Sequence, residues 1–184
     1  MASVETSMWV RHFSWIPPVE PDAWKLNFAG YFIDEDMVAG TGCILRDQNG
    51  VFVAACAGPV KKCGTPTMAH LMALEQGLDV AMRLGVDYLE VEGEHPDVIR
   101  MIQRTFMPST PGMAILLDRC FDLLDGFRKV MVRRIHHLSN EAANVLAAKG
   151  RRLEELVHWN DEPPSDIAPV LVTDVIGQWV HRRD

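Results

Sequence analysis

The sequence predicts an α/β domain in which a mixed sheet of five strands carries helices on both faces. The first observation is a series of three alternating strand patterns, with a tight-turn signal between the second and the third, near the N-terminus. The second is a change to helical spacing of the apolar residues after residue 65, with two short apolar strands interspersed. The 184 residues suffice for one domain with a hydrophobic core.

The three strand patterns predict an antiparallel meander. The strands are expected at residues 25–33, 40–46 and 51–57, since apolar and polar residues alternate along the first of them. Asn49-Gly50 lies between the second and third strands and favours a tight turn, because both residues tolerate a positive φ.

The remaining elements are expected to cross over between strands. Thr65-Pro66 and Thr110-Pro111 are each typical of a helix N-cap followed by proline at the first helical position. Gly77 lies on the apolar stripe of the first helix, which indicates a close approach to the sheet. The expected helices are residues 66–84, 96–106, 110–124 and 140–155, and the expected strands are 86–91 and 130–135.

The chain is expected to divide into three parts. Residues 1–23 form an extended, proline-containing lead-in, residues 24–155 form the domain, and residues 156–184 form a tail that begins near a proline pair. The apolar stretch of the tail either packs back onto the domain or binds a partner. Trp159 and Trp179 would mark a docking patch if they are exposed.

Composition limits the class of protein and its compartment. No basic and apolar leader and no stretch long enough to cross a bilayer is evident, so a nuclear or cytoplasmic rather than secreted or membrane protein is expected. The cysteines show no metal-ligand spacing and are expected as buried free thiols: Cys43, Cys56, Cys63 and Cys120. Three methionines are expected as core filler: Met68, Met72 and Met82.

The charge of the chain is uneven. The formal net charge is −7, yet residues 128–152 contain seven basic residues against the single acid Glu141. This segment is either a solvated helix and strand edge or a docking face for an acidic partner, nucleic acid included. The candidate nucleic-acid-binding residues are Arg128, Lys129, Arg133, Arg134, Lys149, Arg151 and Arg152.

Six strings in the order of the expected elements resemble a known family. The order and the strings are similar to the ribonuclease H-like domain that is common in plant genomes and related to retroelement reverse transcriptases. The resemblance extends from about Trp15 to Gly150 and implies a ribonuclease H-like fold. The strings are Trp15–Pro18, Lys25–Gly30, Gly40–Gly50, Ala69–Leu78, Val91–Glu94 and Asn140–Ala147.

The departures from this family bear on function. The resemblance implies four acids that hold two Mg²⁺ ions for phosphodiester cleavage, but the matching positions here are Ala29, His70, Glu94 and Asn144. A methyl group at Ala29 cannot bind a metal. The sequence therefore predicts the fold without the nuclease and no cofactor, in a module that binds nucleic acid (an RNA–DNA hybrid or RNA) or a protein.

Several alternatives remain open at this site. His70 is expected as a hydrogen-bonded neighbour of the core, with Glu94 as a candidate partner. The alternative is a single Zn²⁺ or Mn²⁺ site formed by His70, Glu94 and Asn144. Such a site would allow an active hybrid ribonuclease with a rearranged metal site. Four further residues are expected at the surface, with a shifted metal ligand (the two acids) or a general base (the two histidines) as the alternative: Asp34, Asp36, His136 and His137.

Overall fold

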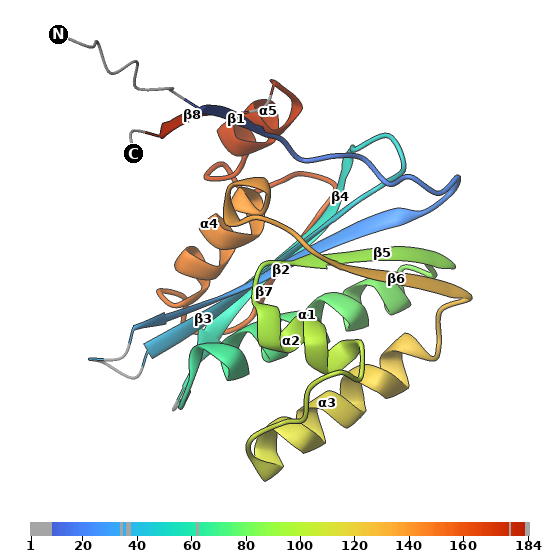
Figure 1. Cartoon of the computed structure of the whole chain (residues 1–184), viewed down its shortest axis with the longest axis vertical. Coiled ribbons are helices and arrows are strands. Elements are labelled where there is room, and N and C mark those ends of the chain that lie inside the picture. Colours follow the sequence, from blue (N-terminus) through green and yellow to red (C-terminus); the bar gives the residue numbers. More distant parts are fainter. Residues whose placement is uncertain (1–8, 34, 36–37, 62, 177, 183–184) are drawn as a thin grey trace, which may run out of the picture.

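The computed structural model describes residues 9–33, 35, 38–61, 63–176 and 178–182 (Figure 1). In this part of the chain a mixed sheet has the strand order β6-β5-β2-β3-β4-β7. β2, β5 and β6 are parallel to one another, and β3, β4 and β7 continue the sheet by antiparallel pairing. The bounds are β2 (Trp24–Ile33), β3 (Val38–Arg46), β4 (Phe52–Val60), β5 (Tyr88–Gly93), β6 (Lys129–Arg134) and β7 (Val157–Asn160).

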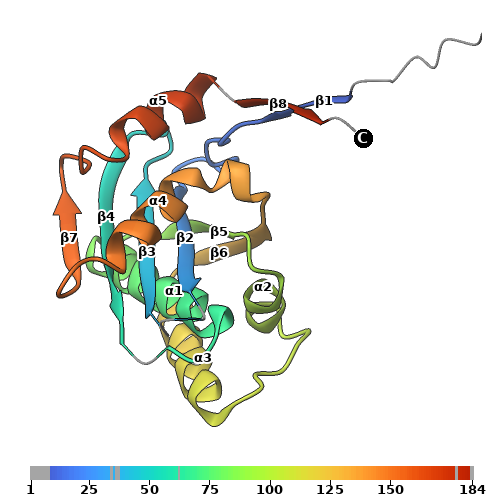
Figure 2. The ribbon, with the colours of Figure 1, turned by 90° about the vertical axis from the view of Figure 1, so that its left-hand side faces the viewer.

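Helices cover both faces of this sheet, as predicted (Figure 2). The first three helices share one core with Leu26 and Phe28 of β2, and the last two share another core with Ala29 of the same strand. None of the described helices is both long and apolar enough to cross a membrane. The helices are α1 (Pro66–Arg83), α2 (Pro96–Ile102), α3 (Pro111–Leu124), α4 (Glu141–Gly150) and α5 (Ala168–Ile176), with a short 3₁₀ turn at His137–Ser139.

The local signals of the sequence are confirmed. The meander forms, and Gly50 in its hairpin turn has a φ of +80°. Thr65 and Thr110 cap their helices, each accepting a hydrogen bond of 3.2 Å from the backbone N–H three residues on. A Cβ at Gly77 would lie 2.7 Å from a methyl group of Leu26, so this glycine allows the close approach of α1 to the sheet.

The predicted count of five strands is wrong, because β7 adds a sixth. Its four residues are too few for a clear alternation, and the strand is defined by its pairing with β4. The expected helix to residue 155 ends instead at Gly150, where the helix meets the sheet so closely that a Cβ would lie 2.5 Å from the carbonyl oxygen of Thr41. The expected helix to residue 106 likewise ends at Ile102.

The lead-in and the tail both join the folded structure. β1 (Trp9–Phe13) pairs with β8 (Gln178–Arg182) in a separate antiparallel ribbon, visible beyond α5 in Figure 2. Ile167 is fully buried, so the tail packs back onto the domain. Trp159 is half-buried against the α4 core, not exposed as a docking patch, and the side chain of Trp179 lies outside the described residues.

Side chains of the core include the residues expected there. Cys43, Cys56, Cys63 and Cys120 are buried free thiols, and burial raises the pKa of Cys120 to about 12. The predicted core methionines are half-buried and pack against the α1 face of the sheet: Met68, Met72 and Met82.

A buried cation lies on the α4 face of the sheet. Lys25 is fully buried, and its Nζ donates to Ile16 O (2.6 Å) and Glu92 Oε1 (2.8 Å). The same nitrogen lies 3.4 Å from Glu90 Oε2. Burial alone would raise the pKa of Glu90, but backbone N–H donors and the charges of Lys25 and Arg133 outweigh it, so the pKa is lowered. The lysine thereby joins the lead-in to β2 and β5.

A second buried pair extends this polar layer. Trp15 Nε1 donates to Asn27 Oδ1 (2.8 Å), and the Arg46 guanidinium lies 4.3 Å from the centre of the Trp15 ring. Arg46 also pairs with Asp174 of α5 at 2.7 Å. The layer thus connects lead-in, sheet and tail through charges that are shielded from water.

Replacement of Lys25 by methionine should destabilise the protein strongly. The change leaves Glu90 and Glu92 buried without the cation between them, which should cost about 3–5 kcal/mol of unfolding free energy. Lys129→Met is the matched control, because its pair with Glu20 is largely exposed and should contribute less than about 1 kcal/mol. Urea unfolding measures both, and equal losses would contradict the role of Lys25.

Candidate functional site

The four positions singled out in the sequence lie at the carboxyl end of β5. Glu94 follows β5, which runs parallel to β2, and the Phe28–Gly93 pair places it next to Ala29. His70 belongs to the second turn of α1 and Asn144 to the first turn of α4. Two helix beginnings and two strands therefore bring these positions together from distant parts of the sequence.

Glu94 and Asn144 are in direct contact. The amide Nδ2 of Asn144 donates to Glu94 Oε2 at 2.9 Å and lies 3.4 Å from His137 O. Nearby, Asn140 Nδ2 donates to Phe28 O at 3.0 Å and ties the start of α4 to β2. The only acid among the four positions is thus held by an amide donor.

His70 pairs with the backbone and not with Glu94 as one alternative predicted. Its Nδ1 accepts a hydrogen bond from the N–H of Gly30 at 3.1 Å. The approach depends on glycine, since a Cβ at Gly30 would lie 2.3 Å from the backbone nitrogen of His70. Burial, and secondarily the neighbouring His95, lowers the pKa of His70 to about 3.

The hydrogen bond to Gly30 fixes the tautomer of the neutral His70 ring. Because Nδ1 accepts, the ring proton must be on Nε2, which then has no lone pair for a metal ion. Among the described residues, no group of three or more His, Cys, Asp or Glu side chains is placed to hold a metal. As arranged, the four positions offer one carboxylate and one neutral amide oxygen.

Basic and imidazole groups lie near the backbone of Glu94. Arg134 Nε donates to the main-chain carbonyl oxygen of Glu94 at 3.2 Å, and the ring of His95, the next residue, has its centre 4.8 Å from that of His70. Burial lowers the pKa of His95. His136 and His137 are exposed with ring centres 4.3 Å apart, which agrees with the interpretation as surface imidazoles. Asp34 and Asp36 lie outside the described residues.

The seven candidate nucleic-acid-binding residues form two groups rather than one continuous face. The first group lies at the β6 edge of the sheet, where Arg128 precedes the strand and Lys129, Arg133 and Arg134 belong to it. The second group, Lys149, Arg151 and Arg152, lies at the end of α4 over β3 and β4.

Several of these cations already have partners within the chain. Arg133 pairs with the buried Glu90, Lys129 with Glu20 (3.0 Å) and Lys149 with Asp166 (2.8 Å). Arg128 and Arg151 lie over the rings of Tyr88 and Tyr31.

The ion cluster around Lys25 was not among the residues predicted from the sequence. A signal was present, because Glu90 lies within the short apolar strand expected at residues 86–91 and Glu92 follows it directly, two positions on and therefore on the same face. Acids inside a sheet require a cation or hydrogen-bond donors. The sequence does not show which of its many cations is brought to them.

The fold agrees with solved structures of RNase H domains. The chain is similar to the N-terminal RNase H domain of Rv2228c from Mycobacterium tuberculosis, with a TM-score of 0.68 and 19% identity over 71% of this chain and 94% of that one. For RNase H1 of Halobacterium salinarum the TM-score is 0.66 and the identity 23%, over 70% of this chain and 96% of that one. For LC11-RNase H1 in complex with an RNA/DNA hybrid the TM-score is 0.65 and the identity 17%, over 70% of this chain and 96% of that one.

These likenesses establish an α/β protein with the RNase H fold, as the sequence predicted. The chain belongs to the reverse transcriptase-like family, whose model matches residues 27–150. A search of curated proteins found no match.

Acidification should destabilise the protein partly through His70. In the unfolded chain the His70 ring binds a proton near pH 6.5, but in the folded protein its pKa is about 3. The contribution of His70 to the unfolding free energy is therefore fully present above about pH 6.5 and is lost as the pH falls toward 3. Between pH 6.5 and pH 4 the loss should be about 3 kcal/mol. Urea unfolding across this range should show a smaller loss in His70→Gln, and identical pH profiles would contradict the assignment.

Replacement of Asn144 by aspartate should make stability depend on divalent cations. The change removes the donor to Glu94 and places two carboxylates together, which should cost roughly 1–3 kcal/mol in EDTA. Mn²⁺ or Mg²⁺ should then raise the melting temperature of this variant by mass action. Asn144→Ala is the control, since it loses the same hydrogen bond without gaining a ligand; a metal response of the alanine variant would contradict the explanation.

Proposed function

We propose that this chain is a non-catalytic RNase H-like module that acts by binding a partner. The observation that carries the proposal is the contact between Asn144 and Glu94, in which an amide donor occupies the space beside the one acid. The six strings of the sequence further support assignment to the plant-type, retroelement-related branch. The four buried free thiols favour a reducing compartment, the nucleus or the cytosol.

The chemistry of the available donors supports the loss of metal-dependent cleavage. Two Mg²⁺ ions close together need several charged oxygen ligands to offset their mutual repulsion. Ala29 offers none, and the Nδ1 lone pair of His70 is occupied by the Gly30 N–H. The residues present do not fit a two-metal centre, so we assign no step of hydrolysis to this site.

The charge distribution favours a protein over nucleic acid as the partner. Net charge is −7, and the basic residues are divided into two groups of which three members are paired with acids. Phosphate binding depends on free cations gathered along one path. Arg134 next to Glu94, and Arg151 and Arg152 at the end of α4, are the residues that would contact an RNA–DNA hybrid or RNA.

A cleavage assay tests the proposal directly. The full chain should give no product from an end-labelled RNA–DNA hybrid with Mg²⁺ or Mn²⁺, while an active RNase H1 serves as the positive control. Cleavage by the wild type that Glu94→Gln abolishes would refute the proposal and support a rearranged metal site. Cleavage that persists in Glu94→Gln would indicate a contaminating nuclease, which a second purification removes before the comparison is repeated.

Hybrid binding by anisotropy separates the two kinds of partner. A protein-binding module should bind the hybrid weakly, and Arg134→Ala should not change its salt dependence. Tight binding would identify nucleic acid as the partner if Arg134→Ala or Arg151→Ala also makes the log–log salt slope shallower, by about 0.9 for each phosphate interaction that the substitution removes.

A further inference from the structure

β7 forms one outer edge of the sheet, at the far end from β6 (Figure 2). It pairs with β4 from Ala57–Val157 to Ala54–Asn160, and within the described residues no strand pairs with its other side. The sequence assigned this segment to the tail, so the edge emerges only in the structure. An unpaired edge offers backbone donors and acceptors to another chain.

The backbone groups at the free edge can be identified. The N–H of Asp161 donates to Val53 O of β4 at 3.4 Å, whereas Asn160 O, on the opposite side of the same peptide unit, accepts from Glu162 N at 2.8 Å. Because the direction of these groups alternates along an antiparallel strand, the N–H groups of His158 and Asn160 point outward. The C=O of His158 also points outward.

Acids flank this edge on both sides. Glu154 and Glu155 precede β7, and Asp161 and Glu162 follow it. All four are exposed, and no ion pair in the described part of the chain involves any of them. Asp161 has a φ of +67°, which turns the chain away at the end of the strand. A four-residue edge with two unpaired acids at either end attracts a positively charged chain.

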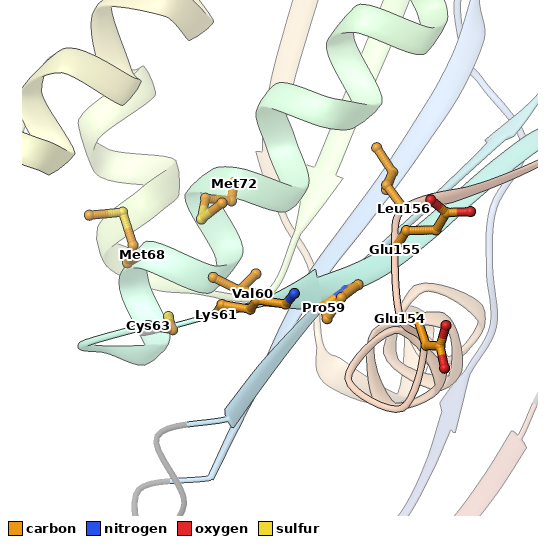
Figure 3. Close-up of a pocket in the computed structure, with 9 residues that line it drawn as sticks. All are labelled: Pro59, Val60, Lys61, Cys63, Met68, Met72, Glu154, Glu155 and Leu156. Atoms are coloured by element: carbon orange, nitrogen blue, oxygen red, sulfur yellow. The ribbon is translucent and has the colours of Figure 1, made fainter.

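A hollow adjoins the beginning of β7. Figure 3 shows Glu154, Glu155 and Leu156 opposite the end of β4 and the first turns of α1, around a volume of about 510 Å³. Val60, Met68, Met72 and Leu156 line it with apolar groups, and Lys61 adds one cation against the two acids. Apolar lining residues next to two carboxylates suit a lysine or arginine side chain, whose hydrocarbon stem would contact the apolar groups while its cationic end lies near the acids.

The four flanking acids disfavour a second copy of this chain as the partner that pairs with β7. Antiparallel pairing of two β7 edges would place Glu154 and Glu155 opposite Asp161 and Glu162 of the other copy, and parallel pairing would place each acid next to its counterpart. Like charges in these positions destabilise both arrangements. The favoured occupant is therefore an extended segment of opposite charge.

We propose that the outer edge of β7 binds an extended lysine- or arginine-rich segment of a partner protein by strand addition. Backbone hydrogen bonds to His158 and Asn160 supply the pairing, and the four acids select the charge. The inference rests on the proposed docking function but not on the loss of cleavage. If the chain cleaves a hybrid and also binds a lysine-rich peptide at β7, only the proposed loss of cleavage is refuted.

The test uses a fluorescein-labelled, end-blocked ten-residue peptide of alternating lysine and valine with the full chain. Anisotropy should show binding, and the glutamate–valine peptide and the lysine–valine peptide N-methylated at alternate residues should bind at least about tenfold more weakly. Equal binding of the N-methylated peptide would overturn strand addition. No binding of the lysine–valine peptide would overturn the proposal as a whole.

Two sets of substitutions distinguish this edge from general attraction to an acidic protein. Neutralising the flanking acids, with Asn at position 161 to tolerate the positive φ, should weaken binding at least about tenfold. The changes are Glu154→Gln, Glu155→Gln, Asp161→Asn and Glu162→Gln. The control changes the net charge equally elsewhere on the exposed surface and should leave most of the binding: Asp87→Asn, Asp118→Asn, Asp122→Asn and Asp125→Asn. Equal effects of both sets would overturn the assignment to β7.

A proline provides a backbone test. His158→Pro removes an N–H that points outward and leaves every hydrogen bond to β4 in place, so it should abolish binding of the lysine–valine peptide. His158→Ala keeps this N–H and should bind the peptide like the wild type. Near-ultraviolet circular dichroism confirms that each variant is folded, and the acid set remains as the independent test if the proline variant is not. Sedimentation showing a dimer that the proline dissociates would assign the edge to a second copy and overturn the proposal.

Discussion

The buried cation of Lys25 is the interaction on which the arrangement of this protein depends. Its Nζ is shared between the carbonyl of Ile16 and the carboxylates of Glu92 and Glu90. Burying any one of these groups without its partners would cost a large desolvation free energy. The lead-in, β2 and β5 must therefore come together cooperatively. Arg133 of β6 completes the charge balance from the next strand. The polar layer therefore fixes the register of three strands and the path of the lead-in.

The candidate site lies at the end of the same strands and has a different character. His70 is held neutral by burial and tied to Gly30, and Glu94 is held by Asn144. These hydrogen bonds connect the beginnings of α1 and α4 to the sheet, a connection that does not need a bound ion. The proposed loss of catalysis and the integrity of the scaffold thus rest on the same contacts, since His70 Nδ1 and Glu94 Oε2 each accept a hydrogen bond from within the protein.

The C-terminal segment gives the proposed docking function a physical basis. Ile167 and the Arg46–Asp174 pair hold it against the domain, and the preceding β7 extends the sheet by one strand. A segment that is fixed in place presents its free edge at little entropic cost, which favours recognition of an extended peptide. The sheet thus has two chemically different edges, because β6 has several cations while β7 is flanked by acids.

The sequence by itself determined the meander, the capped helices and the fold class, because turn residues, N-caps and apolar periodicity act within a few residues of one another. Through the strings that resemble the family, it also indicated the four positions of the candidate site, Ala29, His70, Glu94 and Asn144. Only the tertiary structure decided that Lys25 lies between Glu90 and Glu92, that His70 pairs with Gly30, and that residues 157–160 form a strand. Each of these depends on groups far apart in the chain, and local patterns contain no information about which distant partner satisfies a buried charge or a short strand.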